Sequence, residues 1–224
     1  MLRPHLLVVI AGTGTDVGKT WVGCELAREL QAGGLRVAAR KPVQSFDPAD
    51  GLTDADRLAE ATAEQATDVC PRHRWYPKAM APPMAAEHLG LPPFTLVDLV
   101  SELAWPSQAD VGLVELAGGA RAPLAADGDC ADLVELLSPD LVVLVTGSGL
   151  GILSDVRLAA GALGAVRAQP PIVYLNLFDP TQELHVRNRD WLAQRDNMVV
   201  AVSPRQLAGP VAAFKPGRAG AGPS

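Results

Sequence analysis

Short apolar runs alternate with helix-like segments along most of this chain. The first run, Leu6–Ile10, is rich in β-branched residues, and five further runs of strand length follow at Leu35–Arg40, Asp110–Leu116, Asp140–Val145, Pro171–Leu177 and Met198–Val202. Apolar runs of this length are typical of strands buried on both faces of a parallel sheet. Helices are predicted between them at Trp21–Ala32, Asp54–Ala66, Thr95–Ala104, about Ser154–Arg167 and Thr181–Gln194. This alternation predicts an α/β fold, with a mostly parallel sheet, right-handed crossovers and helices on both faces.

Two stretches depart from that pattern. Trp75–Pro93 is rich in proline, methionine and alanine, and proline interrupts helices and ladders, so an irregular segment is expected there. It forms either a pocket wall or a packed connection. The tail from Gly209 is mostly glycine, proline and alanine and is predicted to be disordered. We therefore expect one domain over residues 1–208 and a disordered segment over 209–224.

Composition narrows the class of protein. The 224 residues are 48% apolar, enough for one sizeable core, and the formal net charge is −6. An acidic chain with no basic run argues against nucleic acid or an anionic membrane as the main partner. No apolar run is long enough to span a bilayer, and the five residues before Leu6 are too short for a signal peptide. Cys24, Cys70 and Cys130 show no CxxC spacing, so we expect reduced, buried thiols in a cytoplasmic protein.

The stretch Leu6–Thr20, LLVVIAGTGTDVGKT, places a glycine-rich loop between a predicted strand and a predicted helix. That context is the one in which a P-loop works, because small residues let backbone N–H groups approach phosphate oxygens at a helix N-terminus. The spacing is G-x₅-GKT from Gly12, one residue longer than the usual pattern. The alternative is an ordinary strand–turn–helix with an incidental GKT. As a P-loop, it predicts that Lys19 reaches the β- and γ-phosphates and that the Thr20 hydroxyl holds Mg²⁺.

Charged residues follow two of the other predicted strands. Lys41 comes after the second strand, where open α/β sheets bind ligands, and is either a phosphate contact or a surface lysine. Asp54 and Asp56 begin the next helix, where they either complement the helix dipole or supply an Mg²⁺ ligand. Glu115 ends a later strand, as a metal or water contact or as a simple strand-end charge.

The motifs together resemble those of dethiobiotin synthetase. The matching segments are G-T-x-T-x-V-G-K-T at Gly12–Thr20, K-P-V-x-S at Lys41–Ser45 and V-E-x-A-G-G at Val114–Gly119. A carboxylate at Asp56, the Leu150-Gly151 pair and the strand-end Asn176 follow in the same order. The resemblance extends from Leu6 to about Pro204.

The resemblance implies an ATP-dependent ring closure. Enzymes of this family carboxylate 7,8-diaminononanoate with CO₂ to a carbamate, which ATP phosphorylates. The neighbouring amine then closes a cyclic urea and releases phosphate. The family works as a homodimer with Mg²⁺, and its active site lies near the subunit interface.

Residue roles carry over by position. Lys19 and Lys41 would stabilise charge on the transferring phosphoryl group, and Thr20, Asp56 and Glu115 would arrange Mg²⁺. Nucleotide contacts would come from Asp16, Val17, Gly18, Lys19, Thr20, Asp56 and Glu115, with Asn176, Ser203, Pro204 and Arg205 at the adenine. The diamine or its carbamate would be bordered by Thr15, Lys41 and Ser45, and its carboxylate held across the interface by Gly151 and Ser154.

Two positions depart from the family pattern and keep rival functions open. Leu116 stands where the family has glycine, and Ser154 where it has asparagine at a helix start. Both favour a divergent relative with another substrate or with lost activity. A P-loop partitioning switch is the other alternative, but its signature lysine position is Gly14 here.

Overall fold

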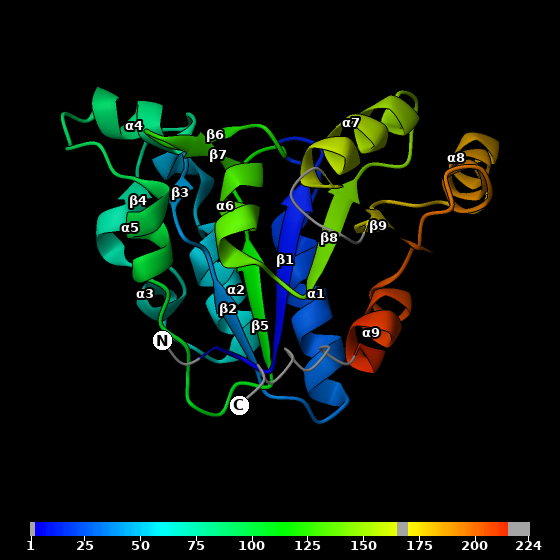
Figure 1. Cartoon of the computed structure of the whole chain (residues 1–224), viewed down its shortest axis with the longest axis horizontal. Helices are drawn as coiled ribbons and strands as arrows, with labels where there is room; N and C mark the ends of the chain where they lie inside the picture. The colour runs from blue at the N-terminus through cyan, green and yellow to red at the C-terminus, as the bar shows by residue number, and fades with distance from the viewer. Residues whose placement is uncertain (1–2, 165–169, 215–224) are drawn as a thin grey trace, which may run out of the picture.

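Six parallel strands form the central sheet in the computed structural model of this chain, which describes residues 3–164 and 170–214 (Figure 1). Their order across the sheet is β10-β9-β8-β1-β5-β2. The bounds are β1 Leu6–Gly12, β2 Val37–Arg40, β5 Val111–Glu115, β8 Leu141–Thr146, β9 Ile172–Leu175 and β10 Val200–Ala201. Each of the six predicted strands is present, and the expected α/β class is confirmed.

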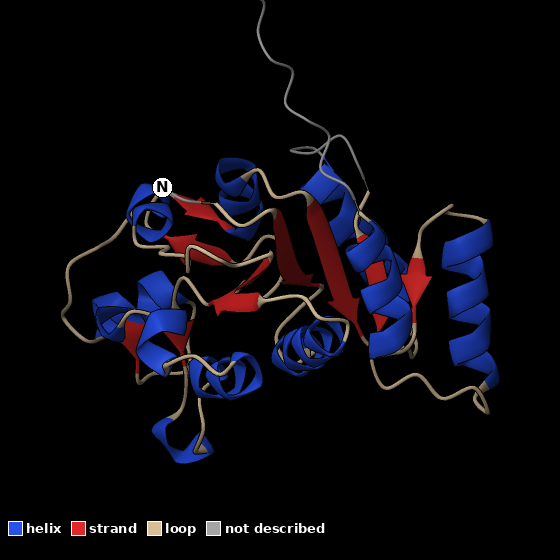
Figure 2. Ribbon diagram, turned by 90° about the horizontal axis from the view of Figure 1, so that it is seen from below, coloured by secondary structure: helices blue, strands red, loops and turns tan. Residues whose placement is uncertain are grey.

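Alternate residues of β1 face opposite layers of helices. Leu6, Val8 and Ile10 belong to a core shared with α1 (Lys19–Ala32) and α9 (Pro204–Ala213). Leu7, Val9 and Ala11 belong to a second core, shared with α6 (Cys130–Leu137), α7 (Ile152–Gly164) and α8 (Glu183–Gln194). Figure 2 shows the resulting sandwich, with helices on both faces of the sheet. A strand whose side chains are buried on both sides must be apolar throughout, which explains the run that starts the chain.

The region between β2 and β5 is more structured than predicted. The helix expected at Asp54–Ala66 is two helices, α2 (Asp54–Thr62) and α3 (Ala66–Val69), because Ala63 adopts a left-handed conformation with φ of 58° and ends the first. The segment expected to be irregular contains β4 (Trp75–Tyr76) and α4 (Pro82–His88). Proline is tolerated in a first helical turn, where its missing N–H has no helical partner to lose.

Several short elements complete the chain. Besides α5 (Leu96–Ser101), they are β3 (Gln44–Ser45), β6 (Pro123–Ala125), β7 (Gly128–Asp129) and the 3₁₀ helices Pro48–Asp50 and Arg72–Arg74. β3 pairs with β4 in parallel, and β6 pairs with β7 antiparallel. The sequence pattern predicted neither these pairs nor α6.

The carboxyl-terminal prediction is partly wrong. Residues 209–213, expected to be disordered, complete α9, whose Leu207 and Val211 are buried against the sheet. Burial of these two side chains stabilises a helix despite the glycine and proline in it. The rest of the predicted disordered segment, residues 215–224, lies outside the described residues, as does the end of the helix expected to reach Arg167.

Two expectations from composition can be compared with the fold. Within residues 3–164 and 170–214, no helix is both long and apolar enough to cross a bilayer. Cys24, Cys70 and Cys130 are buried and free, as expected. Burial raises the pKa of each thiol to about 12, so none is poised as a nucleophile.

Candidate active site

The glycine-rich loop connects the end of β1 to the start of α1. Two residues in it adopt positive φ, Asp16 at 58° and Gly18 at 94°, and together they turn the chain into the helix. No side chain caps α1, whose N-cap is Gly18. An uncapped helix start presents backbone N–H groups and partial positive charge, which favours an anion. The interpretation of GKT as incidental is therefore not supported by the local geometry.

Lys19 lies folded against this loop. Its Nζ donates a hydrogen bond to the carbonyl of Gly14 at 2.8 Å, and the residue is only 7% exposed. Burial lowers the pKa of Lys19, and the nearby charge of Lys41 lowers it further. The loop surrounds the Lys19 ammonium in this position. The ammonium would therefore contact a ligand bound in the loop.

Four polar side chains meet beside the loop. The Thr20 hydroxyl lies 2.8 Å from Oδ1 of Asp54 and 2.9 Å from Oε1 of Glu115. Nζ of Lys41 lies 2.7 Å from Oδ2 of Asp54 and 2.6 Å from Oε1 of Glu115. The four come from α1, the turn after β2, the start of α2 and the last residue of β5. They converge because parallel strands end at the same edge of the sheet.

The charges in this cluster stabilise one another unequally. Lys41 lowers the pKa of Asp54 to about 2. Burial opposes the charge on Lys41, but the two carboxylates outweigh it and hold the pKa of Lys41 above its usual range. Burial raises the pKa of Glu115, because both its oxygens are removed from water.

One oxygen of this cluster has no partner. Oε2 of Glu115 is buried and makes no hydrogen bond within the described structure. A buried, unpaired carboxylate oxygen is costly, and a cation bound beside it would be stabilised. The donor set of Thr20, Asp54 and Glu115 is all oxygen, which suits Mg²⁺. The described residues hold no group of three or more His, Cys, Asp or Glu with metal-site geometry, so phosphate and water oxygens would have to complete the coordination.

The placement of Asp56 beside Thr20 is wrong. Asp56 accepts hydrogen bonds from the backbone N–H and the hydroxyl of Thr53, at 2.8 and 2.7 Å, and closes the capping box of α2. Asp54, two residues earlier, supplies the carboxylate at Thr20 instead. Residues two apart on a helix point about 200° away from each other, so only one of this pair can face α1.

A cavity of about 710 Å³ opens beside the cluster. Thr15, Lys41 and Ser45 line it, together with Lys19, Asp54 and Glu115. The lining also includes Ala79, Met80, Ala81 and Pro82, so the proline-rich segment does form a pocket wall, the first of its two interpretations. The Ser45 hydroxyl donates to the carbonyl of Met80 at 2.5 Å, which ties the loop after β2 to that wall.

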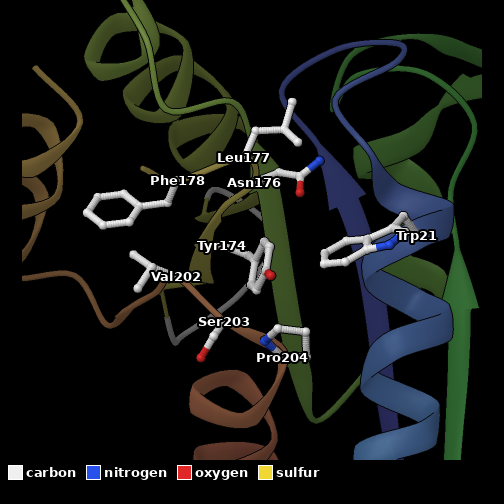
Figure 3. Close-up of a pocket in the computed structure, with 8 residues that line it drawn as sticks. All are labelled: Trp21, Tyr174, Asn176, Leu177, Phe178, Val202, Ser203 and Pro204. Atoms are coloured by element: carbon white, nitrogen blue, oxygen red, sulfur yellow. The ribbon is translucent and has the colours of Figure 1, made fainter. Parts of the chain in front are cut away.

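A second cavity, of about 290 Å³, lies between the start of α1, the end of β9 and the start of α9 (Figure 3). Asn176, Ser203 and Pro204, three of the four residues expected at the adenine, line it, whereas Arg205 is exposed and is not among its lining residues. Nδ2 of Asn176 donates to the carbonyl of Val17 at 3.0 Å. With the nitrogen held there, the amide oxygen of Asn176 faces the cavity, as Figure 3 shows.

Sequence reasoning missed the aromatic walls of this second cavity. Trp21, Tyr174 and Phe178 all line it. Trp21 directly follows the GKT motif, and Tyr174 lies two residues before Asn176. Their closeness in sequence to predicted site residues is the feature that could have indicated them. Leu177, also in the lining, is 84% exposed and adopts a φ of 54°.

Gly151 and Ser154 lie apart from both cavities. Gly151 directly precedes α7 and Ser154 lies in its first turn; both are exposed, and neither is among the lining residues of either cavity. Leu150 beside them is 90% exposed. Within one chain, then, the structure does not bring these two residues to the other predicted site residues.

Leu116 is accommodated without backbone strain. It is not among the residues with positive φ in the described structure, and its side chain is 1% exposed, within the core that contains α6 and α7. The leucine at this position therefore fills core volume, and nothing in its conformation requires glycine.

Fold and site define a nucleotide-binding protein of the P-loop α/β class. A sequence family described as an AAA domain matches residues 7–196. The signal recognition particle receptor FtsY of Elizabethkingia anophelis shares the fold, with a TM-score of 0.50 at 16% identity, covering 92% of this chain and 62% of that one. This chain thus spans less than two thirds of FtsY, and the similarity concerns the fold alone.

Sequence relatives identify the family. The ATP-dependent dethiobiotin synthetase of Caulobacter vibrioides is 43% identical over 164 residues, covering 70% of this chain and 73% of that protein. Those of Rhodococcus erythropolis (38% identity, 71% of this chain, 70% of that protein) and Xanthomonas campestris pv. campestris (36%, 83% and 84%) are also similar. The chain belongs to the dethiobiotin synthetase family, which confirms the resemblance seen in the motifs.

Proposed function

We propose that this chain is an ATP-dependent dethiobiotin synthetase that closes the ring of 7,8-diaminononanoate with CO₂, in biotin biosynthesis. The overall reaction is inferred from the chain's membership of the family. The observation that carries the site is the convergence of Lys19, Thr20, Lys41, Asp54 and Glu115 at one edge of the sheet. Two ammonium groups and two carboxylates there suit a reaction in which phosphate charge is bound and transferred.

The residues have separate tasks in this reaction. Lys19 and the N-terminus of α1 bind the phosphates, and Lys41 stabilises charge on the phosphoryl group as it moves to the carbamate. Phosphoryl transfer depends on positioning and charge stabilisation more than on covalent help from the protein. Thr15 and Ser45 border the carbamate in the larger cavity, whose volume of about 710 Å³ leaves room for the substrate beside the phosphates.

Mg²⁺ belongs to the proposal through Thr20, Asp54 and Glu115. The buried, unpaired Oε2 of Glu115 supports this assignment, as does the all-oxygen donor set. When bound, the ion would neutralise phosphate charge. Asp54 thus takes the role first expected of Asp56.

The nucleobase is assigned to the smaller cavity. The amide oxygen of Asn176 would accept from the exocyclic amine of adenine, and Ser203 and Pro204 would lie along the base. Arg205 is left without a role in this cavity.

A homodimer completes the proposed enzyme. Gly151 and Ser154 would reach the carboxylate of the diamine bound to the partner subunit, which accounts for their distance from this chain's own cavities. The exposed Leu150 and Leu158, at 90% and 73%, support an interface at this end of α7. Three free, buried cysteines agree with the cytoplasmic location that we assign to the reaction. Diamine, CO₂ and ATP are the proposed substrates, and neither nucleic acid nor membrane has a place in the scheme.

The test is phosphate release from ATP in the presence of the diamine and bicarbonate. Controls omit each component in turn, and mass spectrometry identifies the product. We expect phosphate release to depend on both the diamine and bicarbonate, with one dethiobiotin formed per phosphate. ATP turnover that ignores the diamine would favour the divergent relative, for which Ser154 in place of the family's asparagine remains the motivating feature.

A further inference from the structure

Trp21 is an exposed tryptophan at the mouth of the smaller cavity. It is 49% exposed, although it lies two residues after the buried Lys19 in the first turn of α1. The buried side of α1 consists of other residues, among them Val22, Leu26 and Leu30, so the indole does not serve the core. Tryptophan is also only a moderate helix former. Neither packing nor helix propensity accounts for this side chain.

The side chains around the smaller cavity define the space that the Trp21 indole faces. Figure 3 shows Trp21 pointing from α1 toward Tyr174, with Asn176 above the gap between them. Tyr174 is 2% exposed, so its ring forms a fixed wall. The cavity between these aromatic rings holds about 290 Å³, and Pro204 closes it below. A flat, apolar group of ring size fits such a space.

The position of Trp21 in the chain connects this wall to the phosphate loop. Asn176 lies in the same cavity and hydrogen-bonds the loop through the carbonyl of Val17. A nucleotide whose phosphates occupy the loop therefore has its base directed to the side where Trp21 lies. Every nucleobase presents a π-face, so an aromatic wall binds the base without reading its edges.

We propose that Trp21 stacks on the nucleobase and sets the affinity for the nucleotide, a role separate from base selection by Asn176. The inference rests on the proposed ATP-dependent function. Stacking of a base on an aromatic side chain changes affinity by about 5- to 150-fold when the side chain is truncated. The loss should concern nucleotides and spare ligands that have no base.

The experiment compares ADP with inorganic tripolyphosphate by calorimetric titration of the full chain. The variants are Trp21→Ala, Trp21→Phe and, as a matched control, Trp191→Ala. Trp191 is 47% exposed, almost the same as Trp21, but lies on α8 and lines neither cavity. We expect Trp21→Ala to weaken ADP binding about 10- to 100-fold, Trp21→Phe to weaken it less than 10-fold, and Trp191→Ala to leave it unchanged. Tripolyphosphate affinity should be the same in all four proteins.

Fluorescence gives a second readout. Saturating ADP should quench tryptophan emission in the wild type, and Trp21→Phe should remove most of that quenching while still binding ADP. Equal ADP affinity in wild type and Trp21→Ala would overturn the inference. So would a parallel loss of ADP and tripolyphosphate, because it would mean that Trp21 acts through the loop. Failure of the wild type to bind ADP at all would instead reject the proposed ATP-dependent function.

Discussion

Nζ of Lys41 lies 2.6 Å from Oε1 of Glu115, and both side chains are only 2% exposed. Removing one member of a buried ion pair leaves an uncompensated charge and costs about 3–5 kcal/mol. Substitutions of Lys41 or Glu115 would therefore mix effects on folding with effects on chemistry. Lys19 and Asp54 are better probes of the site, because Lys19 contacts a carbonyl and the Asp54 side chain is 40% exposed.

Lys19→Ala should lower the turnover of ATP with the diamine by at least about 10²–10³-fold, the cost of losing one preorganised donor. The reason is the position of Lys19 at the start of α1, inside the loop. Steady-state phosphate release measures the loss. Arg28→Ala, which removes a positive charge from the same helix at an exposed position, is the control. Near-wild-type turnover in Lys19→Ala would reject the phosphate-binding assignment.

Asp54→Asn and Asp56→Asn should separate the metal role from the capping role. Asp54→Asn should raise the Mg²⁺ concentration needed for half-maximal turnover, because the carboxylates of Asp54 and Glu115 both lie within hydrogen-bonding distance of the Thr20 hydroxyl. Asp56→Asn should leave that concentration unchanged and lower the free energy of unfolding by about 1 kcal/mol, since it weakens the capping box of α2. Mg²⁺ titrations and urea denaturation measure the two effects. The reverse assignment of effects would restore Asp56 as the ligand.

Asp54 should also contribute to acid sensitivity. Its pKa lies near 2 in the folded protein because of Lys41, below the ordinary value of 3.8. As the pH falls through this window, the unfolded chain takes up the proton first, so folding stability falls. Asp54→Asn has no such proton to gain, and its unfolding free energy should decline less between pH 4 and pH 2. Urea titrations across that range test this, and identical slopes for the two proteins would contradict it.

Gly18→Ala should cost more stability than Gly34→Ala. Both glycines have positive φ, 94° and 86°, so each alanine is strained. A Cβ at Gly18 would in addition overlap Nδ2 of Asn176, whereas a Cβ at Gly34 meets no atom within 4 Å. We expect about 1 kcal/mol for Gly34→Ala and clearly more for Gly18→Ala, together with weaker ADP binding. Equal unfolding free energies for the two variants would show that the Asn176 side chain moves aside without lowering the stability of the fold.

If the proposed homodimer forms, Leu150→Asp should shift it to the monomer and raise the KM for the diamine. Leu150 is 90% exposed beside Gly151, so a charge there would oppose an apolar interface. Val97→Asp, at a site 64% exposed on α5, is the control and should leave the dimer intact. Sedimentation analysis gives the oligomeric state. A monomeric wild type that turns the diamine over efficiently would contradict the proposed interface.

Ser154 should affect how tightly the proposed interface site binds the diamine. Where the family has asparagine, a serine can lose a side-chain hydrogen bond to the carboxylate of the diamine, worth about 1.5–3 kcal/mol or about ten- to hundredfold in affinity. We therefore expect the wild type to bind the diamine weakly through backbone donors, and only as a dimer.

Local sequence determined the sheet and the phosphate loop. Apolar runs such as Leu6–Ile10 are typical of strands buried on both faces of a parallel sheet, and the GKT that follows marks a helix start. Lys41 directly follows one predicted strand and Glu115 lies at the end of another, and parallel strands end at one edge of the sheet, so the sequence placed both residues at that edge. Each of these inferences depends on a few consecutive residues and one general rule of sheet geometry.

Only the tertiary structure decided which side chains complete the site. Asp54 and Asp56 begin the same helix, and the packing of α2 against α1 turns the first toward Thr20 and leaves the second to cap the helix. Trp21, Tyr174 and Pro204 come from three distant segments and meet only when α1, β9 and α9 are assembled around one cavity. Helix rotation and long-range packing depend on the whole core, so no local pattern specifies them.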